Sequence, residues 1–150
     1  LLRLLAEQSV PPSRIRLEIT ERAMLDNPPE AKRTLQILCN AGVRISLDDF
    51  GTGYSSLSYL HQYPVHALKI DQSFIRGLFT KGEGGSDAVI RSILAMAKLL
   101  SMQVIAEGVE TTEQRDLLLT MGCRFAQGFL YSPAQPFETW VGAAVPNAPA

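Results

Sequence analysis

Five short apolar segments alternate with longer amphipathic segments along this 150-residue chain. The apolar segments predict strands at residues 15–19, 43–47, 67–70, 103–106 and 125–130. Several are near-continuous hydrophobic runs, which is typical of strands covered on both faces. Because strands and helices alternate, we expect a parallel sheet with right-handed crossovers. The pattern therefore indicates an α/β fold.

The segments between the predicted strands carry signals for helix ends. Asn27, followed by proline, predicts the start of one helix, and Gly42 predicts its end. Thr111 and Gln114 have the spacing of a capping box at the start of another helix, which Gly122 ends. These signals support the division into helices and strands.

Composition excludes several classes of protein. Hydrophobic residues make up 46% of the chain and charged residues 19%, which is typical of a globular protein. The net charge is −1 and the basic residues are scattered, so we expect no nucleic-acid polymer as a partner. No apolar run approaches the roughly 20 residues that cross a bilayer, and no signal peptide is recognisable.

The two cysteines indicate a reducing compartment. Cys39 and Cys123 lie far apart in unlike contexts, and no CxxC pair is present. We therefore expect buried, reduced thiols in a cytoplasmic protein rather than a disulfide or a zinc site.

Acidic residues gather where the predicted strands end. Because the carboxyl ends of parallel strands share one face, where ligands bind, we expect these side chains to converge. Like charges that converge need compensation, and a hard divalent cation with oxygen ligands supplies it. One lysine, Lys69, also lies at a strand end. Seven of the fifteen acids lie at or just after the strand ends: Glu18, Glu21, Asp48, Asp49, Asp71, Glu107 and Glu110.

Each acid also has an ordinary interpretation, as a helix cap or as the partner of an arginine or lysine. Glu21 and Asp71 are the strongest candidates for such a structural role, because each lies just past its strand. The consecutive pair Asp48 and Asp49 favours the metal interpretation, since two adjacent carboxylates can serve two ions.

Two loops contain the glycines that permit tight turns. Residues 48–57, DDFGTGYSSL, follow the second predicted strand, and their N–H and hydroxyl groups can approach a phosphate or order the loop. They match neither the Rossmann fingerprint nor the P-loop. Residues 81–85 follow no strand and predict a flexible loop.

Five motifs together resemble the EAL-domain cyclic-di-GMP phosphodiesterases of bacteria. They are LEITE at 17–21, DDFGTGYSSL at 48–57, LKID at 68–71, AEGVET at 106–111 and AQGFL at 126–130. The resemblance implies a TIM-type (β/α)8 barrel, of which this chain would hold roughly strands 4 to 8 with their helices. Residues 1–140 would be the C-terminal part of the domain, and residues 141–150 a loose tail. The Glu-Ala-Leu strand that names the family and an Asn-Leu-Ser strand do not occur in this chain.

The resemblance also implies an activity, namely hydrolysis of cyclic di-GMP to linear pGpG with two Mg²⁺ or Mn²⁺ ions. Glu18 would bind the first ion, Asp48 would bridge both ions and Asp49 would bind the second. Lys69 would hold the attacking water, and Glu107 would be a ligand of the second ion or the base for that water.

Further residues would support this site. By the same resemblance, Glu21 would anchor the loop after Asp49 and link the site to a homodimer interface. Glu110 and Gln127 would lie behind the metal ligands or on the substrate side, whereas Asp71 would tie down its own loop.

Three functional hypotheses follow. The first is the C-terminal part of a competent phosphodiesterase, with a sensory or cyclase domain upstream that can also tether the parent protein to a membrane. By itself this chain is expected to hydrolyse little substrate, because two metal ligands of the family are absent. The second is a non-catalytic cyclic-di-GMP-binding or regulatory EAL module. The third, a different Mg²⁺-dependent phosphate enzyme, explains fewer of the motifs.

Overall fold

The computed structural model describes residues 1–52, 60–79, 85–136 and 139. Most of the glycine-containing loop predicted after Asp49, nearly all of the loop predicted at 81–85 and the whole tail predicted at 141–150 lie outside these residues. The predictions for those segments therefore stay predictions.

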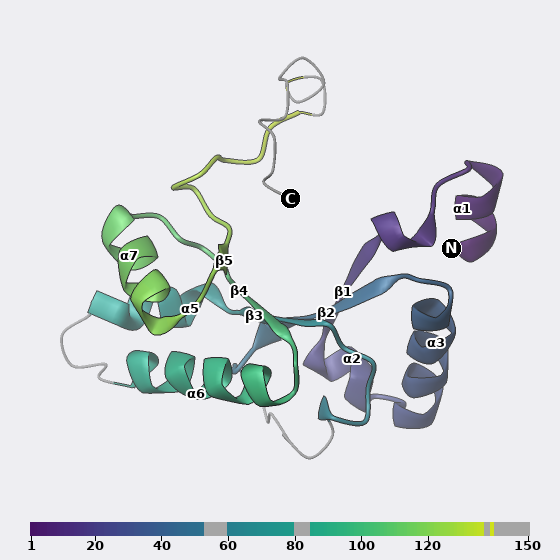
Figure 1. Ribbon diagram of the computed structural model, residues 1–150, viewed down its shortest axis with the longest axis horizontal. Coiled ribbons are helices and arrows are strands. Elements are labelled where there is room, and N and C mark those ends of the chain that lie inside the picture. Colours follow the sequence, from purple (N-terminus) through teal and green to yellow (C-terminus); the bar gives the residue numbers. More distant parts are fainter. Residues whose placement is uncertain (53–59, 80–84, 137–138, 140–150) are drawn as a thin grey trace.

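Five parallel strands form one sheet in the order β1-β2-β3-β4-β5 (Figure 1). Successive strands along the chain are neighbours in the sheet, as in a barrel that is wound in one direction. This arrangement confirms the α/β class and the partial (β/α)8 barrel. The strands are β1 (Arg16–Thr20), β2 (Arg44–Phe50), β3 (Ala67–Ile70), β4 (Gln103–Ala106) and β5 (Phe125–Ala126).

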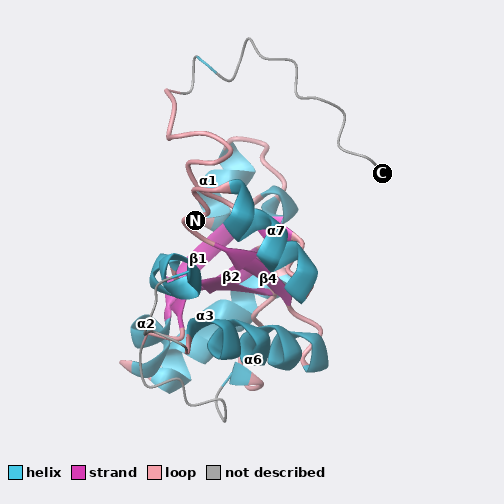
Figure 2. Ribbon diagram, turned by 90° about the vertical axis from the view of Figure 1, so that its left-hand side faces the viewer, coloured by secondary structure: helices cyan, strands magenta, loops and turns pink. Residues whose placement is uncertain are grey.

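The helices α2, α3 and α6 lie on one side of the sheet in both views (Figures 1 and 2). No helix among the described residues is long and apolar enough to cross a membrane. Two 3₁₀ turns, η1 (Pro12–Arg14) and η2 (Gly77–Phe79), accompany the helices. The described helices are α1 (Leu2–Glu7), α2 (Glu21–Leu25), α3 (Pro28–Asn40), α5 (Gln72–Arg76), α6 (Ser86–Leu99) and α7 (Thr112–Met121).

The predicted helix ends are largely confirmed. The Thr111 side chain accepts a hydrogen bond from Gln114 N (3.2 Å), and the Gln114 side chain accepts one from Thr111 N (3.1 Å), which completes the capping box. Gly122 ends α7 with φ +94°, the left-handed conformation expected of a helix stop. Asn27 precedes α3, but its side-chain amide donates to Glu30 (2.7 Å) rather than capping a backbone N–H.

The helices cover only one face of the sheet at its β1 end. All four residues of β3 are buried, as predicted, but exposure alternates along β1. Leu17 and Ile19 are half-buried, whereas Arg16, Glu18 and Thr20 are exposed. The expectation of strands covered on both faces, made for several near-continuous hydrophobic runs, therefore holds for β3 and does not extend to β1. The packed core lies on the helix side and includes Ile45, Leu47, Leu68, Ile70 and Ile90.

The fifth strand is shorter than predicted and ends at Ala126 instead of residue 130. After Gln127 N donates to Ala106 O (2.9 Å), the chain leaves β4 and pairs with the loop behind it. Val109 N donates to Gln127 O (3.0 Å), and Leu130 N donates to Val109 O (3.0 Å). The apolar residues after Ala126 therefore form a loop that hydrogen-bonds with Val109. Hydrophobicity alone does not distinguish such a loop from a strand.

Candidate active site

Strand alternation brings five predicted site residues to one face of the sheet. Cα pairing aligns Glu18 with Ser46 on β1 and β2, and Ser46 with Ala67 on β3. Because side chains two residues apart share a face, Asp48 and Lys69 lie on this same side. The pairing of Ile105 with Lys69 and with Phe125 extends the face to two more side chains, Glu107 and Gln127.

A buried lysine lies at the centre of this face. Lys69 is only 3% exposed, and its Nζ lies 2.6 Å from Glu18 Oε2 and 2.6 Å from Glu107 Oε1. Asp48 Oδ1 lies 3.0 Å from the same nitrogen. One ammonium group therefore joins carboxylates from β1, β2 and the end of β4. This clustering confirms the expected convergence for three of the seven acids, Glu18, Asp48 and Glu107.

The pKa values reflect this arrangement. Burial by itself lowers the pKa of Lys69, but its close contacts with the carboxylates of Glu107, Glu18 and Asp48 outweigh burial and raise that pKa above its ordinary value. Burial raises the pKa of Glu107, although the neighbouring Lys69 ammonium acts in the opposite direction. Lys69 is therefore charged across the physiological range, whereas Glu107 is easier to protonate than an ordinary glutamate.

A backbone irregularity presents two consecutive aspartates to one site. Leu47 pairs with Leu68 and Phe50 pairs with Ile70, so β2 uses one more residue than β3 over this stretch. Asp49, inside this bulge, has φ +53°. In a regular strand Asp48 and Asp49 would face opposite sides of the sheet, whereas a bulge turns adjacent side chains toward the same side.

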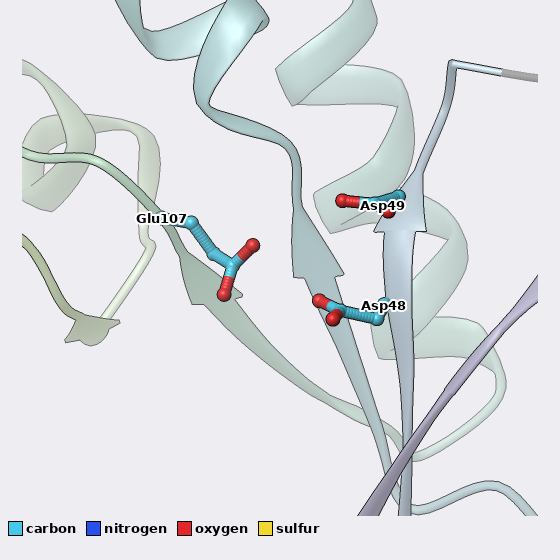
Figure 3. A group of neighbouring side chains, drawn as sticks. All are labelled: Asp48, Asp49 and Glu107. Atoms are coloured by element: carbon cyan, nitrogen blue, oxygen red, sulfur yellow. The ribbon is translucent and has the colours of Figure 1, made fainter.

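Asp48, Asp49 and Glu107 form a group suited to a metal ion. One carboxylate oxygen from each lies within 4.8 Å of the other two, and the three carboxylates point toward one another on either side of β3 (Figure 3). Asp48 Oδ1 is buried and has no hydrogen bond of regular geometry, although Lys69 lies nearby. An all-oxygen donor set, with a buried acceptor that lacks a regular hydrogen bond, fits a hard divalent cation.

The remaining predicted residues divide into two groups. Gln127 Nε2 donates to Glu107 Oε1 (2.5 Å), so Gln127 holds one of the three carboxylates in place. Asp71 accepts from Ser73 N (2.9 Å) and caps α5, which is the structural role expected of it. Glu110 forms an ion pair with Arg76 (3.3 Å), away from the three-carboxylate group.

Glu18 and Glu21 also lie outside the three-carboxylate group. Glu18 contacts Lys69 instead, so its role as a metal ligand stays a prediction. Glu21 is the half-buried first residue of α2. The loop that Glu21 is predicted to anchor lies largely outside the described residues.

Sequence reasoning missed two buried polar residues near the site. Ser46 is completely buried two residues before Asp48 on the same face, and its Oγ has no hydrogen-bond partner among the described residues. Strand alternation was the signal that could have identified Ser46. Gln114 was recognised only as a helix cap, yet it also contacts a second helix. No sequence pattern indicates that contact.

Known proteins are similar to this chain in sequence and in structure. The cyclic di-GMP phosphodiesterase RocR of Pseudomonas aeruginosa is 39% identical over 133 residues, which are 89% of this chain and 33% of RocR. The solved structure "PaMucR Phosphodiesterase, c-di-GMP complex" is 39% identical with a TM-score of 0.87, covering 93% of this chain and 56% of that one.

A second similar structure is a complex with manganese. The manganese/cy-diGMP complex of Klebsiella pneumoniae BlrP1 at pH 9.0 is 32% identical with a TM-score of 0.74, covering 84% of this chain and 32% of that one. This chain spans between 17% and 33% of the length of several curated relatives that it matches. The EAL domain profile matches residues 1–134, and the chain therefore belongs to the EAL domain family.

Proposed function

We propose that this chain supplies part of the active site of a cyclic-di-GMP phosphodiesterase, which hydrolyses cyclic di-GMP to linear pGpG. The observation that carries the proposal is the group Asp48, Asp49 and Glu107 next to the buried Lys69, at the carboxyl ends of parallel strands. Relatives whose names include this activity or this ligand support the choice of substrate.

Asp48, Asp49 and Glu107 would hold divalent cations, with Glu18 as a further ligand on the other side of Lys69. Mg²⁺ and Mn²⁺ both suit a set of carboxylate oxygens. A pair of such ions, when bound, polarises the phosphate and lowers the pKa of the attacking water. The match of the Asp48–Glu107 cluster to a hard cation supports this assignment.

The protein's own side chains position the reactants. Lys69 carries a permanent positive charge at the strand ends, so it can donate a hydrogen bond to the attacking water and offset charge on the phosphate. In the alternative role, as a base rather than a ligand, Glu107 would accept a proton from the attacking water. Gln127 orients Glu107 through its 2.5 Å hydrogen bond.

Other features of the parent protein belong to the same proposal. The domain would end near residue 140, six residues beyond the match of the family profile. The complete domain would act as a homodimer in the cytoplasm, controlled by a sensory or cyclase domain elsewhere in the protein. MucR, a relative described as both a diguanylate cyclase and a phosphodiesterase, supports such a domain combination.

The decisive experiment compares two aspartates in the complete protein. Asp48→Asn should abolish Mg²⁺-dependent formation of pGpG, measured by chromatography of the products. Asp87→Asn is the matched control, because Asp87 pairs with Arg91 on the surface of α6 and should retain full activity. Near-normal turnover by Asp48→Asn would overturn the assignment. Binding of cyclic di-GMP without turnover by the wild type would identify a non-catalytic module instead.

A further inference from the structure

The short helix α5 lies against two glycines close to the three carboxylates: Gly51, which follows β2, and Gly108, which follows Glu107. A Cβ added to Gly51, two residues after Asp49, would come within 2.8 Å of the Phe74 ring. A Cβ added to Gly108, next to Glu107, would come within 2.6 Å of Gln72 Cβ. Both segments therefore pack closely against α5 at these glycines.

Gln114 joins α5 to the loop behind Glu107. Its Oε1 accepts hydrogen bonds from Glu110 N (2.8 Å) and Thr111 N (3.1 Å), and its Nε2 donates to Ile75 O on α5 (3.4 Å). A capping box requires only the bond to Thr111 N. The other two bonds therefore serve a different purpose, which is to hold the loop on the helix.

The hydrogen bonds of Gln114 are more buried than the other polar contact between α5 and this loop, the Arg76–Glu110 ion pair. Gln114 is 8% exposed, so an unsatisfied amide at this position would carry a desolvation penalty. The Arg76–Glu110 ion pair joins the same two elements, but its side chains are 60% and 42% exposed. Exposed ion pairs contribute little, so Gln114 is the main polar connection.

We propose that Gln114 is a positioning residue for Glu107: it fixes the loop of residues 107–111 on α5 and thereby sets the distance between Glu107 and the Asp48–Asp49 pair. This inference deepens the proposed function and rests on it. Residues that orient metal ligands commonly affect metal affinity about 10- to 100-fold. Gln114 would act in this way from outside the metal group.

Two substitutions test the connection in the complete protein. Gln114→Glu keeps an acceptor for the two N–H groups but replaces the donor to Ile75 O with an oxygen. Gln114→Asn is one methylene shorter, so its amide is withdrawn from Ile75 O and from the N–H groups of Glu110 and Thr111 as well. Thr111→Ala is the matched control, since it removes a capping bond from the same helix end and leaves every side-chain bond of Gln114 in place.

The first measurement is amide hydrogen exchange without metal. Both Gln114 variants should exchange faster in residues 107–111 and in α5, whereas Thr111→Ala should exchange faster only at the start of α7. If the Gln114 variants match Thr111→Ala, the connection is absent and the inference is overturned. This readout does not depend on any metal.

The second measurement is the affinity for Mn²⁺ alone, determined by titration calorimetry. Both Gln114 variants should bind Mn²⁺ about 10-fold more weakly than the wild type, with no change in Thr111→Ala. Faster exchange with unchanged affinity would show that Gln114 is purely structural and overturn its positioning role. Failure of the wild type to bind Mn²⁺ would instead overturn the proposed metal site together with this role, while the exchange data still report on the connection.

Discussion

Lys69 and Glu107 come from neighbouring parallel elements and meet at 2.6 Å, so the candidate metal site contains its own counter-ion. Three carboxylates surround one ammonium group. In the absence of a cation, Lys69 is thus what makes the convergence of these acids tolerable. A divalent cation and Lys69 would therefore both reduce the repulsion among these carboxylates.

Removing this lysine should destabilise the metal-free protein. We expect Lys69→Met to lower the free energy of unfolding by about 2 kcal/mol in a chelator, because three partly exposed carboxylates lose the ammonium group that pairs with them. Saturating Mg²⁺ should restore part of the loss. Urea unfolding measures both values. Lys98→Met, on α6, is the control and should change stability by less than about 0.5 kcal/mol. Equal losses in the two variants would contradict the counter-ion role.

Glu107 should give the metal-free protein a characteristic pH dependence. Because burial raises the pKa of Glu107 in the folded state above its ordinary 4.5, the folded protein holds a proton that the unfolded chain has released. Its free energy of unfolding should therefore fall as pH rises from about 4.5 through the folded pKa. Glu107→Gln lacks this contribution.

The measurement is the difference in unfolding free energy between the two proteins across this pH window, in a chelator. The wild type should lose stability relative to Glu107→Gln as pH rises. Lys69 stays charged throughout, since its pKa is raised, and adds no slope of its own. Parallel curves would show that burial does not control the Glu107 carboxyl.

Much of the site could be predicted because it depends on strand alternation and strand ends. The order of the five apolar segments fixed which acids share an edge, and Glu18, Asp48 and Glu107 do meet at Lys69. Helix ends were equally readable, because the capping box of α7 is a local interaction. A feature of this kind can be predicted because it depends only on residues close together in the sequence.

Other features depend on contacts between distant segments and had no local signal. The end of β5 is set by the pairing of Gln127 and Leu130 with Val109. The exposure of one face of β1 depends on which elements cover the sheet. The bulge in β2 follows from its register with β3, and it is what brings Asp49 to the metal group.

The bulge makes a prediction about Asp49. Its φ of +53° is a conformation that side chains disfavour by about 1–2 kcal/mol and that glycine adopts freely. Asp49→Gly should therefore be more stable than Asp49→Ala by about 1 kcal/mol in urea unfolding with chelator. Both variants should lose Mn²⁺ affinity, because both lack the carboxylate. Equal stability of the two variants would show that the backbone at this position is not strained.

Gly128 lies very close to Val109, and the effect of this contact on stability can be measured separately from the effect of a positive φ. A Cβ on Gly128 would overlap Val109 N and O, which are held by hydrogen bonds to Gln127 and Leu130 and cannot move freely. Gly128→Ala should therefore destabilise the protein by about 3 kcal/mol. Because Val109 belongs to the loop behind Glu107, the variant should also bind Mn²⁺ more weakly.

Gly122→Ala provides the matched control. Gly122 also has a positive φ, +94°, but a Cβ there would meet nothing within 4 Å. Backbone strain alone should reduce its stability by about 1 kcal/mol, with Mn²⁺ affinity unchanged. Urea unfolding and Mn²⁺ calorimetry on both variants test the difference. If Gly128→Ala is no worse than Gly122→Ala in either measurement, the contact with Val109 does not hold the Glu107 loop in place.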